Sequence, residues 1–127
     1  MTFILVDIVL PIWERNLLQY TKSHMKLLGK QILYNFKEQH ADARSQIESW
    51  EAEVEEAQWS TPADLKRRYP KASFLKNQHV VFDICWNRYR LLVLVTYKSG
   101  IVLIKKVGTH KEYDNWNQNL GRVLFKH

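Results

Sequence analysis

Three β-rich segments separated only by short polar turns constrain the fold of this chain more than any other feature. They cover residues 80–84, 89–97 and 101–107, and consist mostly of valine, leucine, isoleucine and tyrosine. Parallel neighbours need a crossover of about a dozen residues or more, so strands joined by links this short must be antiparallel neighbours. In the second turn, Gly100 can supply a positive φ.

Helical periodicity dominates the chain before these strands. A short strand is predicted at residues 26–28, followed by an amphipathic helix at residues 29–39. A second helix, with Asp42 as its expected N-cap, follows a short turn. Its glutamates cover the solvent side, and its apolar stripe at helical spacing consists of Ile47, Trp50, Val54 and Ala57.

Residues 60–64 carry the residue types that begin a third, short helix. Ser60 or Thr61 can cap it, Pro62 suits its first turn, and Asp64 complements its positive end. This helix should end before Pro70, because the residue before a proline disfavours helical backbone. These elements predict an α+β fold, in which an N-terminal helical hairpin packs on an antiparallel sheet of three to four strands, followed by a short C-terminal helix.

The first 24 residues differ from the rest of the chain. Residues 2–13 are apolar but are interrupted by Asp7 and Pro11, and this run is shorter than the ~20 residues of a membrane span. They also lack the positive n-region and cleavage site of a secretory signal. We interpret residues 1–24 as an N-terminal extension, or as upstream sequence read in front of a start at Met25. Residues 25–127 are expected to form one domain.

Charge is distributed unevenly along the chain, whose net charge is +6. Residues 37–64 contain eight acidic and two basic residues, whereas residues 65–127 contain thirteen Lys and Arg and three acidic residues. The basic half suggests a polyanionic partner such as nucleic acid, although a small basic protein need not bind one. The single Cys85 excludes an intramolecular disulfide and a cysteine-based zinc site, and it fits a reducing cytoplasm.

A polar stretch after the third β-rich segment completes a family pattern. This stretch is Val107-Gly-Thr-His-Lys-Glu-Tyr-Asp114. Ahead of it, in order, stand Trp59-Ser-Thr-Pro-Ala-Asp-Leu-Lys, Tyr69-Pro-Lys-Ala-Ser, Val81-Phe-Asp-Ile, Asn87-Arg-Tyr-Arg-Leu-Leu and Ile104-Lys. Over about residues 25–116 the chain resembles the HigB-type toxins of the RelE/ParE superfamily.

The resemblance implies a RelE-like fold and a type II toxin–antitoxin toxin. Such a toxin is a ribosome-dependent mRNA endonuclease, or mRNA interferase, which inhibits translation in the cytoplasm. It needs no metal and no cofactor, because the RNA 2′-hydroxyl attacks its own phosphate. The implied partners are a HigA-like helix-turn-helix antitoxin, mRNA on the ribosome and ribosomal RNA, with no membrane. A start near Met25 is also implied.

This chemistry requires a base, an acid and cations around the phosphate. The residues expected to be catalytic are Arg90, Lys105, His110 and Tyr113. Arg90 stands among leucines in a strand, where it either clamps a phosphate, as the family motif implies, or forms a structural salt bridge. Lys105 stands where many relatives carry Arg. Lys105 and its neighbour Lys106 should point to opposite faces of their strand, one of them sharing a face with Arg90.

His110 and Tyr113 are three residues apart and should face the same way on a helical turn. Imidazole suits acid–base work near neutral pH, but a capping or packing role after Thr109, itself a candidate N-cap, is the alternative for His110. Asp114 is expected to orient a cation or cap a helix, and Glu112 to point outward. Trp116 either covers the site or packs on the sheet.

Further basic residues are expected to dock RNA or the ribosome, or else to form an ordinary solvated face. They are Lys66, Arg67, Arg68, Lys71, Lys76, Arg88 and Lys106.

Three other functions remain open from the sequence. A ParE-like inhibitor of DNA gyrase would share the fold, and would have no chemical reason to keep the four catalytic residue types. A non-catalytic RNA-binding module would use the basic half alone. A membrane-associated protein would use residues 2–13.

Overall fold

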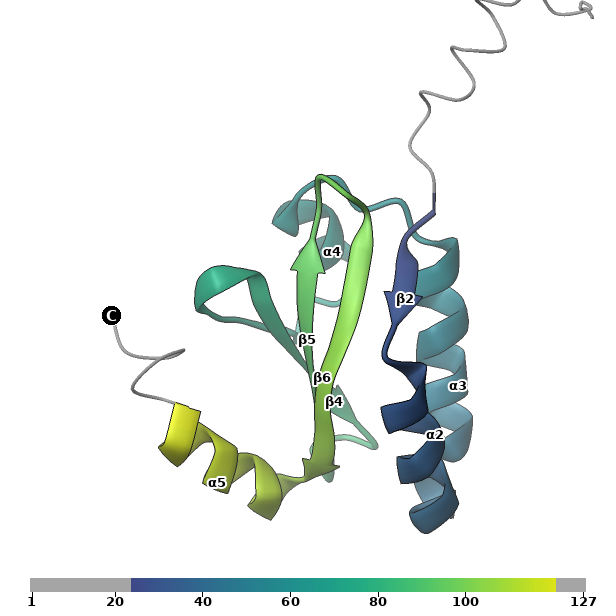
Figure 1. The fold of residues 1–127 in the computed structure, drawn as a ribbon, viewed down its shortest axis with the longest axis vertical. Helices are drawn as coiled ribbons and strands as arrows, with labels where there is room; N and C mark the ends of the chain where they lie inside the picture. Colours follow the sequence, from purple (N-terminus) through teal and green to yellow (C-terminus); the bar gives the residue numbers. More distant parts are fainter. Residues whose placement is uncertain (1–23, 121–127) are drawn as a thin grey trace, which may run out of the picture.

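The computed structural model of the chain describes residues 24–120. The predicted N-terminal extension therefore lies outside the described residues, except for His24, as do residues 121–127. Among residues 24–120, no helix is long and apolar enough to cross a membrane. The architecture is α+β, with helices on both sides of one sheet (Figure 1).

The sheet of the described part has five strands in the order β2-β6-β5-β4-β3. Its centre is the predicted antiparallel meander of β4 (His79–Ile84), β5 (Tyr89–Thr96) and β6 (Ile101–Thr109). The short links enforce this order, and Gly100 adopts the positive φ of 72° in the second turn. The predicted meander is confirmed.

Two details of the sheet differ from the prediction. The strand β2 (Lys26–Leu28) is present but pairs parallel with β6, so the sheet is mixed rather than purely antiparallel. The rule for short links does not apply to this pair, because most of the domain separates the two strands in the chain. A further strand, β3 (Ser73–Phe74), pairs with the edge of β4 and is too short to leave a periodic pattern.

The helical hairpin is formed by α2 (Lys30–Gln39) and α3 (Ala41–Glu56), which lie together on one side of the sheet (Figure 1). The short helix α4 (Pro62–Arg68) begins with the predicted capping box between Thr61 and Asp64. The prediction of Asp42 as an N-cap is wrong. α3 begins at Ala41, and the Asp42 carboxylate instead accepts hydrogen bonds from Arg88 and Tyr89 on the β-hairpin.

The hydrophobic core fills the space between the helices and the inner face of the sheet. From α3, Ile47, Trp50 and Val54 point into it, as the predicted stripe requires. From the sheet, Phe82 meets the Trp50 ring edge-to-face with centroids 5.3 Å apart. This packing fixes the meander against the hairpin and leaves the opposite, outer face of the sheet for other contacts.

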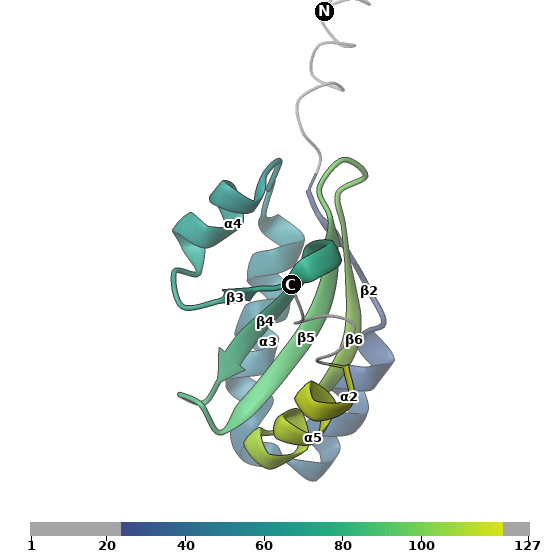
Figure 2. The same ribbon diagram turned by 90° about the vertical axis from the view of Figure 1, so that its left-hand side faces the viewer.

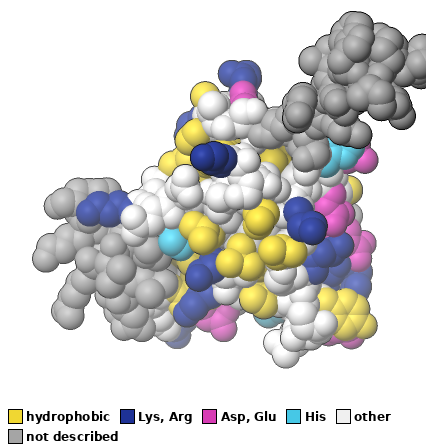
Figure 3. Space-filling view, turned by 45° about the horizontal axis from the view of Figure 1, so that its top comes forward, with side chains coloured by type: hydrophobic (Ala, Val, Ile, Leu, Met, Phe, Trp, Pro, Cys, Tyr) yellow, Lys and Arg dark blue, Asp and Glu magenta, His cyan; other side chains and the backbone are white. Residues whose placement is uncertain are grey.

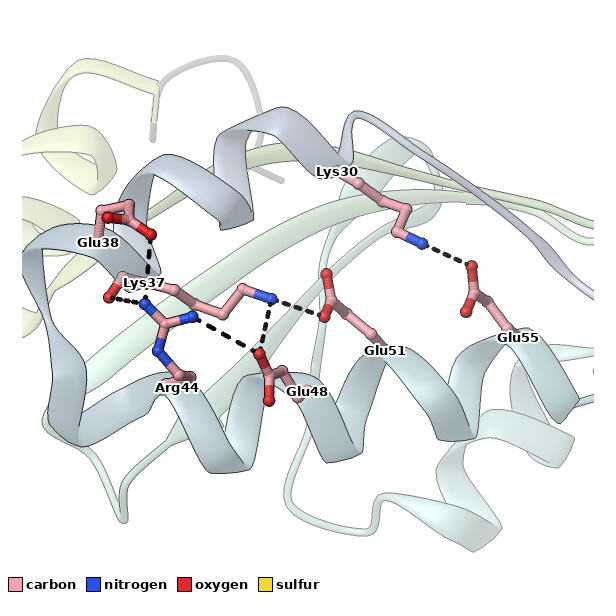
Figure 4. A network of polar contacts seen from close by, with 7 residues as sticks. All are labelled: Lys30, Lys37, Glu38, Arg44, Glu48, Glu51 and Glu55. Atoms are coloured by element: carbon pink, nitrogen blue, oxygen red, sulfur yellow. Dashed lines mark hydrogen bonds and ion pairs between the residues drawn. The ribbon is translucent and has the colours of Figure 1, made fainter.

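A polar network joins the two helices of the hairpin (Figure 4). The ammonium group of Lys37, whose side chain is only 9% exposed, lies 3.1 Å from Glu51 and 3.4 Å from Glu48. Arg44 reaches back from α3 to donate to the backbone carbonyl of Lys37 and to pair with Glu38. The acidic run predicted as a solvated face is therefore partly used to hold α2 and α3 together.

Candidate active site

The last helix of the described residues, α5 (His110–Leu120), lies on the side of the sheet opposite the helical hairpin (Figures 1 and 2). It runs for 11 residues rather than the single turn expected. Thr109 is its N-cap, as predicted. The Thr109 hydroxyl accepts from the Glu112 N–H at 3.1 Å, and the Glu112 carboxylate accepts from the Thr109 N–H at 2.8 Å. Glu112 is exposed, but its carboxylate serves this cap.

Gly108 allows α5 to fold back closely against the end of β6. A Cβ atom at this position would lie 2.9 Å from Cζ2 of Trp116. The absence of a side chain therefore lets the indole of Trp116 pack directly on the strand. The sequence left two roles open for Trp116, and the structure packs it on the sheet beside the candidate site.

Arg90 is held in place from two directions on the outer face of the sheet. Its Nε lies 3.3 Å from the carboxylate of Asp83, its cross-strand neighbour, and its Nη1 donates to the carbonyl of Asn87 at 2.9 Å. The side chain is 14% exposed. Cζ lies 5.5 Å from the centroid of the Tyr113 ring, so the guanidinium also packs on an aromatic face.

The salt bridge considered as the alternative role of Arg90 is thus present. It does not occupy the whole guanidinium, because among residues 24–116 no hydrogen bond or ion pair uses Nη2. The cation is oriented by fixed partners while part of its donor set remains for an anion.

Tyr113 joins Arg90 to the rest of the outer face. Burial raises the pKa of its phenol, the guanidinium of Arg90 acts in the opposite direction, and the carboxylates of Asp114 and Asp83 add to the rise. Tyr113 is therefore a neutral hydrogen-bond donor near pH 7. Its ring meets that of Trp116 edge-to-face, with centroids 6.0 Å apart.

A β-bulge decides where the two lysines of β6 stand. The register shifts between Leu92 and Val93 of β5, which leaves Lys105 as the extra residue and pairs Lys106 with Leu92. Lys106 therefore shares the outer face with Arg90, and its Nζ lies 5.5 Å from the centroid of the Trp116 ring. The expected alternation of the two lysines is interrupted, and both line one hollow beside Trp116.

His110 begins α5, and its backbone N–H donates to the backbone carbonyl of Arg88 at 3.0 Å. Its imidazole Nδ1 lies 3.4 Å from the Asp114 carboxylate, one helical turn further on. Among residues 24–116, no hydrogen bond, ion pair or ring contact joins the His110 side chain to Arg90 or Tyr113. The Asp114 carboxylate therefore orients the imidazole ring.

Residues 43–116, more than half of the chain, match the family model HigB_toxin, described as the RelE-like toxic component of a toxin–antitoxin system. The chain belongs to this family. It is also 26% identical over 92 residues to the mRNA interferase toxin HigB of Escherichia coli K12. The aligned segment covers 71% of this chain and 88% of that protein. Matches of the same identity and coverage are the mRNA interferases HigB of Escherichia coli O157:H7 and Shigella flexneri.

The part of this HigB-family toxin that the family model matches includes Asp83, Arg90, Lys106, Tyr113 and Trp116. Among the described residues, no group of three or more His, Cys, Asp or Glu side chains is placed to hold a metal ion.

Several of the predicted docking residues are engaged within the toxin itself. Arg67 pairs with Asp64 at 2.6 Å, Arg68 pairs with Glu53, and Arg88 pairs with Asp42 at 2.7 Å. Lys66 donates to the backbone carbonyl of Ala72 at 3.3 Å and packs over the Phe74 ring.

Two other predicted docking lysines, Lys71 and Lys76, are exposed and form no ion pair among residues 24–116. Lys76 lies in the 3-10 turn η1 (Lys76–Gln78), on the same side of the sheet as α5 (Figure 2). In Figure 3, acidic side chains gather mostly at the right-hand side, while basic and hydrophobic side chains share the middle of that surface.

Asp83 was not singled out from the sequence as a candidate site residue. It lies directly opposite Arg90 across the β4–β5 hairpin. Counting outward from the turn between the two strands would have paired these residues, because the hairpin fixes the register. Lys106 was assigned to docking, and only the bulge reveals that it stands on the face of Arg90.

Proposed function

We propose that this HigB-family toxin is an mRNA endonuclease that cuts mRNA on the translating ribosome. The RNA 2′-hydroxyl attacks the adjacent phosphate, the O2′–P bond forms, and the P–O5′ bond breaks. The observation that carries this proposal is the Arg90 guanidinium, fixed by Asp83 and Asn87 and packed against Tyr113. The relatives named mRNA interferases support it.

Each group has a role that its surroundings support. Arg90 binds a non-bridging oxygen of the scissile phosphate and stabilises the charge that grows there. His110, oriented by Asp114, takes the proton from the 2′-hydroxyl. Tyr113, a neutral phenol, donates its proton toward the departing 5′-oxygen. Lys105 and Lys106 neutralise neighbouring phosphates of the same strand.

The proposal extends to the setting in which the toxin acts. Ribosomes and mRNA place the reaction in the cytoplasm, and the family assignment implies a neutralising antitoxin. We propose that this antitoxin is a HigA-like helix-turn-helix protein. Lys71 and Lys76 remain the best candidates for docking on ribosomal RNA, because their charges are not paired among the described residues.

The test is cleavage on programmed ribosomes. Purified toxin is added to ribosomes that hold an mRNA with a defined codon in the A site, and the 5′ ends are mapped. The same mRNA without ribosomes, and one carrying a 2′-deoxynucleotide at the mapped position, are tested in parallel. Cuts that require both the ribosome and the 2′-hydroxyl are expected. Intact mRNA together with inhibited supercoiling by DNA gyrase would replace the proposal with a gyrase inhibitor on the same fold.

A further inference from the structure

A hollow of about 450 Å³ lies between α2, the end of β6 and α5, next to the candidate active site. Its size falls within the range of about 300–1,000 Å³ that is usual for small-ligand sites. The proposed cleavage chemistry acts on the outer face around Arg90 and uses only the two lysines of this hollow, Lys105 and Lys106. Its lining consists of Ile32, Lys105, Lys106, Val107, Glu112, Asn115 and Trp116. The Glu112 carboxylate already accepts the hydrogen bond from the Thr109 N–H.

The lining offers a separate chemical partner for each part of a nucleotide. The half-buried indole of Trp116 offers an aromatic surface on which a base can stack. Two ammonium groups, from Lys105 and Lys106, stand at the same hollow and suit a phosphate. Asn115 adds an amide that can both donate to and accept from the edge of a base. Ile32, 37% exposed on α2, supplies an apolar wall.

Trp116 is held rigidly enough to act as a stacking platform. It packs against Gly108, whose missing side chain leaves room for the indole. The Tyr113 ring meets it edge-to-face, and the Lys106 ammonium lies over its ring. A platform fixed from three sides loses little side-chain freedom when a base binds.

The hollow and the candidate active site form one continuous surface. Cation and aromatic ring alternate along it, from Lys106 to Trp116, then Tyr113 and Arg90. In the sheet, Leu92 pairs with Lys106, and Arg90 is the next residue of β5 on that face. A strand of RNA whose phosphate is bound by Arg90 can therefore place a neighbouring nucleotide in the hollow.

We infer that the hollow binds one nucleotide of the mRNA beside the scissile phosphate, with Trp116 stacking on its base and Asn115 reading its edge. This inference rests on the proposed function for the identity of the ligand. It adds a specificity subsite that lies outside the catalytic groups. Lys105 then serves the phosphate of the docked nucleotide rather than the reacting one.

The test measures binding without cleavage. The ligand is a short single-stranded RNA with all 2′-hydroxyls methylated, and its affinity for the full-length toxin is measured by fluorescence anisotropy. Trp116→Leu should weaken binding by about tenfold or more, the usual effect of losing one stacked base. Trp116→Phe should restore most of the affinity. Trp86→Leu is the matched control, because Trp86 is 89% exposed on the β4–β5 turn and does not line the hollow.

A second series locates the docked base. Abasic nucleotides are introduced one position at a time, and the effect of Trp116→Leu should disappear at one position only, because the base that stacks there is already missing. Asn115→Ala, which leaves the packing on Gly108 intact, should change the base preferred at that same position. The four free nucleoside monophosphates serve as competitors and should bind far more weakly than the RNA.

The results separate the subsite from the nuclease. A Trp116-dependent affinity in a toxin that cuts no mRNA would retain the subsite and remove the proposed function. Equal affinities of Trp116→Leu and wild type would overturn the subsite even if cleavage were observed. The same holds if Trp86→Leu weakens binding as much as Trp116→Leu, or if no abasic position removes the effect. Free nucleotides that bind as tightly as the RNA would show a mononucleotide site and would also overturn the inference.

Discussion

The ion pairs that join α2 and α3 allow a sharp test of how burial sets the value of a charge. Lys37 and Glu51 have side chains only 9% and 12% exposed, whereas Lys30 and Glu55, which join the same two helices, are 50% and 45% exposed (Figure 4). Both pairs are lysine–glutamate contacts, at 3.1 Å and 3.0 Å. The chemistry of the two pairs is matched, and they differ in the access of water and in one additional contact, that of Lys37 with the exposed Glu48.

Lys37→Met keeps the length of the side chain but leaves the Glu51 carboxylate without its partner in a nearly buried place. Loss of one member of a buried pair costs about 3–5 kcal/mol of the free energy of unfolding. Lys30→Met removes an exposed pair, which is worth about 0–1 kcal/mol. Combining Lys37→Met with Glu51→Leu should recover most of the loss, because no uncompensated buried charge then remains.

Urea unfolding followed by circular dichroism gives the four free energies, and thermal midpoints should fall in the same order. A cost of Lys37→Met equal to that of Lys30→Met would refute the reasoning, because burial would then not decide the strength of these pairs. A double variant as unstable as Lys37→Met alone would also refute it.

Four further outcomes follow from the site and its surroundings. Gly108→Ala should displace α5 and slow cleavage, measured beside its near-ultraviolet circular dichroism, because a Cβ would collide with the Glu112 carboxylate and would lie 2.9 Å from an indole carbon of Trp116. Asp83→Asn should slow cleavage several-fold while the purified protein melts as a single cooperative unit, since it frees Arg90 from one of its two fixed partners. Burial raises the pKa of Tyr113, and the phenol acts when protonated, so the loss of cleavage rate from ionisation of this group should have its midpoint above pH 10.0, the ordinary pKa of tyrosine. Hydrogen bonds from Tyr89 and Arg88 lower the pKa of Asp42 below its ordinary value of 3.8. Asp42 therefore stabilises the fold above pH 3.8, and this contribution is lost as the pH falls through the lower pKa of the folded state. Asp42→Asn should reduce the loss of stability on acidification, measured by urea unfolding at neutral and acidic pH.

The fold was most predictable where the sequence leaves the backbone little choice. The links between β4, β5 and β6 are too short for any arrangement other than antiparallel neighbours. Thr61, Pro62 and Asp64 form a local capping motif whose partners lie within three residues, and the structure contains it as predicted.

Long-range geometry explains what the sequence did not reveal. The parallel direction of β2 depends on how the helical hairpin returns to the sheet, and no local pattern records this. Asp42 has the residue type of an N-cap, but its oxygen atoms find Arg88 and Tyr89 across the fold. Tertiary partners therefore override a local preference that was correctly recognised.

The candidate site shows the same division. The residue types and the motif pointed to Arg90, His110 and Tyr113, and the structure brings Arg90 and Tyr113 together while His110 pairs with Asp114. The bulge that turns Lys105 and Lys106 toward one hollow has no sequence signal, because a single extra residue in a strand leaves its composition unchanged.

The most direct test of the central claim is a single-turnover cleavage rate for Tyr113→Phe on programmed ribosomes. The variant loses one hydroxyl group and keeps the ring that packs against Arg90. Its matched control is Tyr97→Phe, because burial also raises the pKa of Tyr97, which lies just beyond the far end of β5. We expect Tyr113→Phe to slow cleavage by about 10²–10⁴, the usual contribution of a general acid, and Tyr97→Phe to cleave at the wild-type rate. Equal rates for Tyr113→Phe and wild type would contradict it.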